Sequence, residues 1–230
     1  LPNCPETPLM FYKQDFLDAH SLQELTVFLK ECKGANQFHQ LSGRHVLKFG
    51  HDYNYTSDSN APVSTDIPPP LKSIIEKVTS DFKLTHTPNS VLINYYPPVS
   101  TEHQDSYLPH HADDEPEILP DSEIATISIG DLRTISFKPI HAARLYPADE
   151  MKELVPSSNS VYVMSRSSQS WYKHGIVEAS PAHDDPEGKG RFSITLRTVN
   201  KNYKRSTIII GDSNTKPIKF GSGVGTMGQS

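Results

Sequence analysis

The stretch Arg191–Arg197, with the sequence RFSITLR, alternates polar and apolar side chains over its whole length. This alternation is typical of a β-strand, in which successive side chains point to opposite faces. The polar positions, from Arg191 through Ser193 and Thr195 to Arg197, would then share one face. A strand with a solvent-exposed charged face would give the same pattern, so the stretch alone leaves the role of its arginines open.

Other short runs rich in β-branched and aromatic residues precede this stretch, and polar or proline-containing turns separate them. They cover residues 91–96, 124–129, 134–137 and 160–164, and the last run continues the RFSITLR strand to Val199. Strands with this spacing favour an antiparallel sandwich or jelly roll.

Two helices are expected before these strands. Ser21 and Glu24 have the spacing of a capping box, and apolar residues recur at helical intervals over residues 22–32. After the prolines at 68–70, an apolar stripe over residues 71–82 predicts a second helix that packs on a sheet. Loops and short hairpins are expected between the helices, and no helix after them. The predicted fold class is mainly β with flanking helices (α+β).

The composition suits one compact domain, with 230 residues, 35% hydrophobic content and a net charge of -5. This charge predicts no overall basic surface, so any polyanion would be bound locally. Cys4 and Cys32 do not form a secreted-type disulfide framework, and neither a signal peptide nor a bilayer-spanning apolar run is apparent. We therefore expect an intracellular, cytoplasmic protein with no membrane association. A start at Leu1 without methionine suggests a piece of a longer polypeptide.

Candidate metal ligands occur at His111 and Asp113, which are separated by one residue and so share one side of an extended segment. His110 would point to the opposite side. With 11 histidines in the chain, such a pair can arise by chance, and a third ligand must come from elsewhere. His174, just before the apolar residues 175–177, is the candidate. Two histidines and one carboxylate leave open positions on an octahedral ion, which is the pattern of oxygen-activating iron(II) enzymes.

The open positions suit a 2-oxoglutarate co-substrate, which would fill two of them, and dioxygen, which would take the third. The far carboxylate of 2-oxoglutarate needs a fixed bidentate cation, and arginine supplies that planar geometry. Arg191 is the candidate for this cation because its strand begins less than twenty residues after His174.

The order Asn94-Tyr95-Tyr96, His111-Ala112-Asp113-Asp114-Glu115, His174 and Arg191–Arg197 resembles the AlkB-like dioxygenases. These include the AlkB domains in the replicase polyproteins of some plant RNA viruses. The resemblance covers roughly Phe11 to Asn200. It implies a double-stranded β-helix (jelly roll) with N-terminal helices and a nucleotide-recognition lid. The implied dioxygenase domain spans residues 1–205, with the lid at about 34–66 and the core at about 85–200.

The resemblance also implies roles for individual residues. The iron ligands, which are also the catalytic residues, would be His111, Asp113 and His174. Arg191 would hold the distal carboxylate of 2-oxoglutarate, and the other co-substrate contacts would come from Asn94, Tyr96 and Arg197. The substrate base would be bound by an acidic residue and by lid aromatics, namely Glu115, Tyr53 and Tyr55. Family members often carry Asn where this chain has Ser193.

The implied activity is oxidative demethylation of alkylated nucleic-acid bases, with release of formaldehyde, succinate and carbon dioxide. Unpaired substrate is expected because an oxidant at a fixed metal cannot reach a stacked, paired base. The resemblance to the viral replicase-embedded members places RNA ahead of DNA. One alternative is a 2-oxoglutarate-dependent hydroxylase or demethylase of a protein or small molecule, for which Tyr53, Tyr55 and Glu115 would be dispensable. Another is a non-catalytic nucleic-acid-binding module of a polyprotein, covalently linked to neighbouring domains.

The C-terminal residues 206–230 contain the sequence TIIIGDSNT at 207–215, which resembles the opening nucleophile block of SGNH-type hydrolases. In that family Ser213 would be the nucleophile, but the other residues that the reaction requires do not follow. The segment is either the first strand of a truncated neighbouring domain or a chance match. No hydrolase activity is expected in either case.

Overall fold

A computed structural model describes residues 10–52, 61–98, 107–140, 152–176 and 190–203. The predicted lid tyrosines Tyr53 and Tyr55 lie outside the described residues, as does the C-terminal segment with Ser213. Among the described helices, none combines the length and apolar character needed to cross a membrane.

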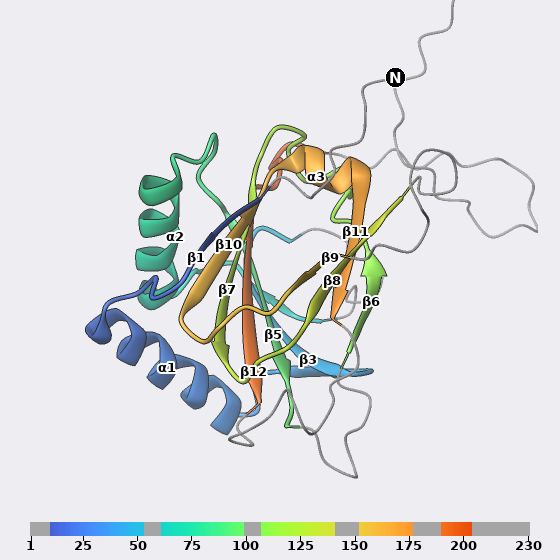
Figure 1. Cartoon of the computed structure of the whole chain (residues 1–230). Helices are drawn as coiled ribbons and strands as arrows, with labels where there is room; N and C mark the ends of the chain where they lie inside the picture. The colour runs from blue at the N-terminus through green and yellow to red at the C-terminus, as the bar shows by residue number, and fades with distance from the viewer. Residues whose placement is uncertain (1–9, 53–60, 99–106, 141–151, 177–189, 204–230) are drawn as a thin grey trace, which may run out of the picture.

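Two antiparallel sheets form the body of the molecule (Figure 1). The strands of the large sheet are, in spatial order, β1 (Met10–Lys13), β10 (Ser160–Met164), β7 (Ile124–Gly130), β12 (Arg191–Arg197), β5 (Ser90–Tyr96), β3 (Arg44–Gly50) and β2 (His39–Leu41). The short strand β4 (Val63–Ser64) pairs in parallel with β3. The strands of the small sheet are β6 (Leu108–His111), β11 (Tyr172–Ile176), β8 (Ile135–Pro139) and β9 (Lys152–Leu154). The expected jelly-roll fold is confirmed.

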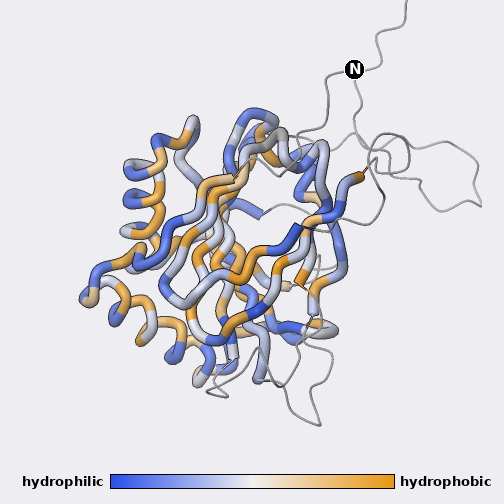
Figure 2. Tube along the Cα trace, in the orientation of Figure 1, coloured by the Kyte–Doolittle hydropathy of each residue, from blue (hydrophilic) through white to orange (hydrophobic). Residues whose placement is uncertain are grey.

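Two long helices, α1 (Ala19–Gly34) and α2 (Pro69–Phe82), lie on one side of the large sheet, opposite the small sheet (Figure 1). Apolar residues run along the central strands in Figure 2, whereas the outer turns of the helices are mostly polar. The first core lies between the helices and the sheet and includes Leu25, Leu29, Leu71, Ile74, Ile194 and Leu196. The second lies between the two sheets and includes Tyr96, Ile124, Phe137, Tyr162 and Ile176.

The two faces of β12 explain where a polar site can form. Its apolar residues Ile194 and Leu196 face the helices and are fully buried. Ser193 and Arg197 therefore face the space between the sheets, as the alternation in the sequence predicts. Because β12 pairs with β5 on one side and β7 on the other, these polar side chains lie at the centre of the sheet.

Three local predictions were wrong or incomplete. The capping box at Ser21 is wrong, because Asp18 caps α1 by accepting a hydrogen bond from the Ser21 N–H at 2.9 Å. A third helix, the short α3 (Arg166–Trp171), joins β10 to β11 although no further helix was expected. The segment predicted as loops and short hairpins does contain a hairpin, β2–β3, but the prediction was incomplete because it did not include a strand as long as β3. This strand carries the polar residues Arg44 and Lys48 inside the fold, so its sequence lacks the apolar alternation of a core strand.

Candidate metal centre and co-substrate pocket

The predicted metal ligands come together at the small sheet. The ligand atoms of His111, Asp113 and His174 all lie within 4.8 Å of one another. His111 ends β6 and stands directly opposite His174 in β11, with their ring centroids 4.4 Å apart. Asp113 follows two positions after the end of β6. His110 points elsewhere, and its Nε2 lies 2.7 Å from the hydroxyl of Ser136 on β8.

The protonation states in this cluster suit a metal ion. Burial would raise the pKa of Asp113, but the charges of Arg197, His174 and His111 hold that pKa well below its usual range. Arg197 Nη2 donates to both carboxylate oxygens of Asp113, at 2.9 and 2.8 Å. Burial, together with His111, lowers the pKa of His174 to about 3. An ionised carboxylate and a neutral imidazole are the forms that bind metal.

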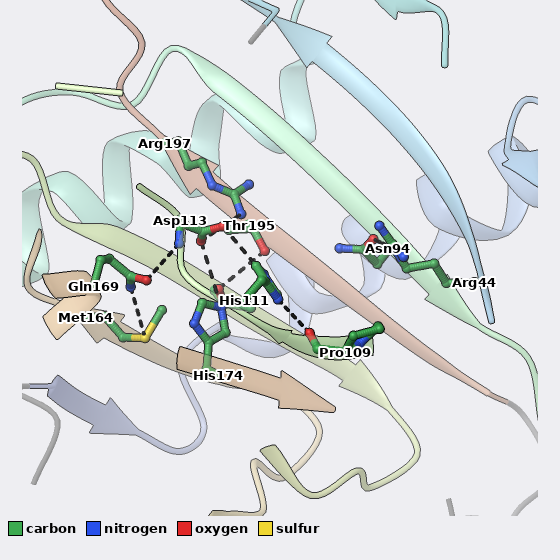
Figure 3. A network of polar contacts seen from close by, with 11 residues as sticks. Arg44, Asn94, Pro109, His111, Asp113, Met164, Gln169, His174, Thr195 and Arg197 are labelled. Atoms are coloured by element: carbon green, nitrogen blue, oxygen red, sulfur yellow. Dashed lines mark hydrogen bonds and ion pairs between the residues drawn. The ribbon is translucent and has the colours of Figure 1, made fainter. Parts of the chain in front are cut away.

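The orientation of His111 is fixed by its own strand. Its Nδ1 lies 2.9 Å from the carbonyl oxygen of Pro109, so Nδ1 carries the proton and donates to that oxygen. This leaves Nε2 as the ligand atom, and it faces Asp113 Oδ1 at 3.6 Å. Figure 3 shows the two imidazoles and the carboxylate converging on one point.

A small pocket, part of it open to solvent, lies beside the cluster and between the two sheets. Its walls contain His111, Asp113 and His174 on one side. The large sheet supplies the other walls, which include Arg44, Asn94, Tyr96, Ser193, Thr195 and Arg197.

Arg191 lies at the opposite end of β12 from Arg197 and is 0% exposed. Its Nη2 donates to Ser128 Oγ at 2.9 Å, and its Cζ lies 5.8 Å from the ring centroid of Tyr96, which lines the pocket. Within the part of the chain that the structure describes, its Nε and Nη1 have no hydrogen-bond partner. Two unused donors on a buried guanidinium are costly unless an anion accepts from them. A carboxylate of 2-oxoglutarate fits this requirement.

The family model of the 2OG-Fe(II) oxygenase superfamily matches residues 14–197. The chain belongs to this superfamily. Its cofactors are therefore iron(II) and 2-oxoglutarate, and its oxidant is dioxygen. The His-Asp-His cluster and the open donors of Arg191 suit this cofactor pair.

Among known proteins, the oxygenase is similar to AlkB homologues and to a viral replication protein. It is 25% identical over 159 residues to the tRNA (carboxymethyluridine(34)-5-O)-methyltransferase ALKBH8 of Mus musculus. The aligned region covers 68% of this chain and 22% of that protein. The oxygenase is 26% identical over 176 residues to the RNA replication protein of grapevine virus A, covering 75% of this chain and 9% of that protein. The chain thus spans only a minor part of both relatives. The structure of OsALKBH1 has the same fold, with a TM-score of 0.59 and 17% identity over 84% of this chain and 99% of that chain.

The other predicted site residues that the structure describes, Asn94, Tyr96 and Glu115, lie at or near the pocket. Asn94 and Tyr96 line it from β5. The Oδ1 of Asn94 accepts a hydrogen bond from Arg44 Nε at 2.9 Å, so a co-substrate oxygen would have to be met by the Asn94 amide nitrogen. Glu115 is partly buried outside the pocket lining, and burial and the nearby Asp113 raise its pKa to about 7.

Sequence patterns did not identify two residues at the site, Arg44 in the pocket wall and Gln169 behind the ligand cluster. Arg44 projects from β3 into the pocket and is 5% exposed. The β3 sequence shows no apolar alternation that would mark Arg44, since Val46 and Leu47 are adjacent, so its place in the pocket wall follows only from the pairing of β3 with β5. Gln169 of α3 accepts a hydrogen bond from the backbone N–H of Asp113 at 2.9 Å. No sequence pattern marks it, because this contact joins segments far apart in the chain.

Proposed function

We propose that this oxygenase demethylates alkylated bases of single-stranded nucleic acid, with iron(II) held by His111, Asp113 and His174. The observation that carries the proposal is the pocket between the sheets, whose walls contain both the ligand cluster and Arg44. The named relatives support a nucleic-acid substrate, since one is named for tRNA and the other for RNA replication.

The bound iron and 2-oxoglutarate would supply the oxidation of a methyl C–H bond by dioxygen. Arg191, whose Nε and Nη1 have no hydrogen-bond partner among the described residues, would bind the distal carboxylate of the co-substrate through two adjacent N–H groups on one edge of its guanidinium. Tyr96 and the Asn94 amide would donate to the other oxygens of the co-substrate. Arg197 keeps Asp113 ionised through two short hydrogen bonds. A hydroxylated N-methyl group leaves as formaldehyde, and the co-substrate leaves as succinate and carbon dioxide.

The charge distribution supports an anionic or polar substrate at this pocket. The whole chain has a net charge of -5, yet Arg44 and Lys48 project from the same face of β3 and are 5% and 6% exposed. Lys48 lies opposite Leu92 of β5, a residue that lines the pocket. Arg44 in the pocket wall would contact the acceptor-rich edge of a nucleotide base or its phosphate, whereas Lys48 is ion-paired with Asp52.

The depth of the ligand cluster supports unpaired substrate. Asp113 is 1% and His174 is 8% exposed, so a base must leave its stack to bring a methyl group to the metal. In a single strand this costs less free energy, because no base pair has to be broken. Sequence reasoning assigned base stacking to Tyr53 or Tyr55 and readout to Glu115, and we retain these roles as part of the proposal.

The proposal also includes the organisation of the chain. The dioxygenase domain would span residues 1–205, with a lid at about 34–66, and residues 206–230 would be a separate tail. The replication-protein relative supports a polyprotein setting with covalently linked neighbouring domains.

The test is formaldehyde release from matched oligonucleotides that carry a base methylated on its pairing edge, as single strand and duplex, in RNA and in DNA. We expect faster release from single strands than from duplexes, and RNA ahead of DNA. Faster release from the duplex would contradict the access argument. Absence of formaldehyde from all four substrates, by enzyme that still converts 2-oxoglutarate to succinate, would instead favour a protein or small-molecule substrate.

A further inference from the structure

The three residues of the ligand cluster are held in different ways. His111 and His174 face each other across the β6–β11 pair, so the strand register positions both. Asp113 lies beyond the last residue of β6, where this pairing has ended. Arg197 donates hydrogen bonds to both oxygens of the Asp113 carboxylate, which orients the side chain. These bonds do not hold the Asp113 backbone, which requires a second contact.

Gln169 makes this second contact. Its Oε1 accepts a hydrogen bond from the Asp113 backbone N–H at 2.9 Å, and its side chain is buried, with 2% exposure. The other end of the amide, Nε2, lies 3.7 Å from the sulfur of Met164 at the end of β10. Figure 3 shows the amide between Met164 and Asp113. Because the sulfur can only accept, this arrangement fixes which end of the amide faces Asp113.

The position of Gln169 in the fold links the two halves of the cluster. It belongs to α3, and α3 runs directly into β11, which carries His174. The hydrogen bond to Asp113 therefore ties the segment of one ligand to the segment of another. A shift of α3 would move His174 and Asp113 together.

We infer that Gln169 is a positioning residue that sets the metal affinity of the site through Asp113. The inference rests on the metal site proposed above. Groups that orient metal ligands typically change metal affinity about 10- to 100-fold when they are removed. Gln169 touches neither the pocket nor the metal position, so its effect must pass through the carboxylate that it holds in place.

The experiment measures Ni(II) binding to the metal-free full chain by isothermal titration calorimetry. Ni(II) binds nitrogen and oxygen ligands more tightly than Fe(II), which keeps weakened variants measurable. Gln169→Met keeps the length of the side chain and removes its acceptor. We expect its Ni(II) dissociation constant to rise about tenfold or more. Ser170→Ala, at the exposed next position of α3, is the control and should bind Ni(II) like the parent protein.

A double-mutant cycle separates positioning from a general loss of stability. In an Asp113→Ala background the carboxylate is gone, so Gln169→Met should then cause little further change in Ni(II) affinity. An equal loss in both backgrounds would overturn the inference, because the effect would not pass through Asp113. Unchanged affinity in Gln169→Met alone would overturn it as well.

Failure of the metal site itself gives a different result, since Asp113→Ala would then leave Ni(II) affinity unchanged. If Gln169→Met does not fold, judged by its thermal unfolding, Gln169→Glu provides the test. It retains an acceptor for the Asp113 N–H, so it should bind Ni(II) at least as tightly as the parent protein. A tenfold loss in that variant would overturn the inference.

Discussion

Replacement of His111, Asp113 or His174 by alanine is expected to abolish iron-dependent formation of succinate from 2-oxoglutarate. Each change removes one of three protein ligands from a cluster whose ligand atoms lie within 4.8 Å of one another. The Asp113→Ala variant loses a ligand and, in addition, leaves the Arg197 guanidinium buried without the carboxylate that it binds. The measurements are succinate release and iron content of each purified variant.

The matched control is His110→Ala, adjacent to His111 in the same strand. The His110 ring contacts Ser136 and does not belong to the ligand cluster, so this variant should keep most of its activity and its iron. Near-native turnover with normal iron content in any of the three ligand variants would contradict the assignment. Thermal unfolding of every variant shows whether a loss of activity follows from a loss of fold.

Arg191→Lys is expected to raise the Michaelis constant for 2-oxoglutarate about a hundredfold. Lysine keeps the positive charge but cannot donate to Ser128 and at the same time present a planar pair of donors to a carboxylate. Loss of a buried bidentate ion pair commonly costs about 3 kcal/mol, which corresponds to about two orders of magnitude in affinity.

Two further measurements sharpen the test of Arg191. The Arg191→Lys variant should bind Ni(II) as the parent protein does, because Arg191 is not part of the ligand cluster. Ser128→Ala, which removes only the protein hydrogen bond to Arg191, should raise the Michaelis constant for 2-oxoglutarate much less. A Michaelis constant that is unchanged in Arg191→Lys would contradict the role of this arginine.

The strands that could be predicted from the sequence are those whose apolar residues face a core. β5, β7 and β10 are buried along almost their whole length, and their sequences are rich in β-branched and aromatic residues. In β12 the alternation itself revealed the polar face that lines the pocket. The extent of β3 was not predicted within the expected hairpin region, because β3 buries Arg44 and Lys48, and burial of cations is decided by neighbouring strands rather than by local sequence.

The ligand cluster could be anticipated because the spacing of His111 and Asp113 is a local feature and metal chemistry limits the choice of a third ligand. Gln169 and Arg44 could not be anticipated in the same way. Their roles depend on hydrogen bonds to Asp113 and Asn94, which lie far away in the chain and become neighbours only in the folded sheets. The start of α1 was misplaced for a local reason, since Asp18 and Ser21 are both good capping residues and the structure uses the first.

The central claim is that one iron(II) site and one buried arginine together form the oxidative centre. The most direct test is anomalous X-ray diffraction at the iron absorption edge from crystals grown anaerobically with iron(II) and 2-oxoglutarate. We expect one strong peak within bonding distance of His111 Nε2, Asp113 and His174 Nε2, with the distal carboxylate of 2-oxoglutarate on Arg191. An iron peak away from these three side chains, or 2-oxoglutarate bound without contact to Arg191, would contradict it.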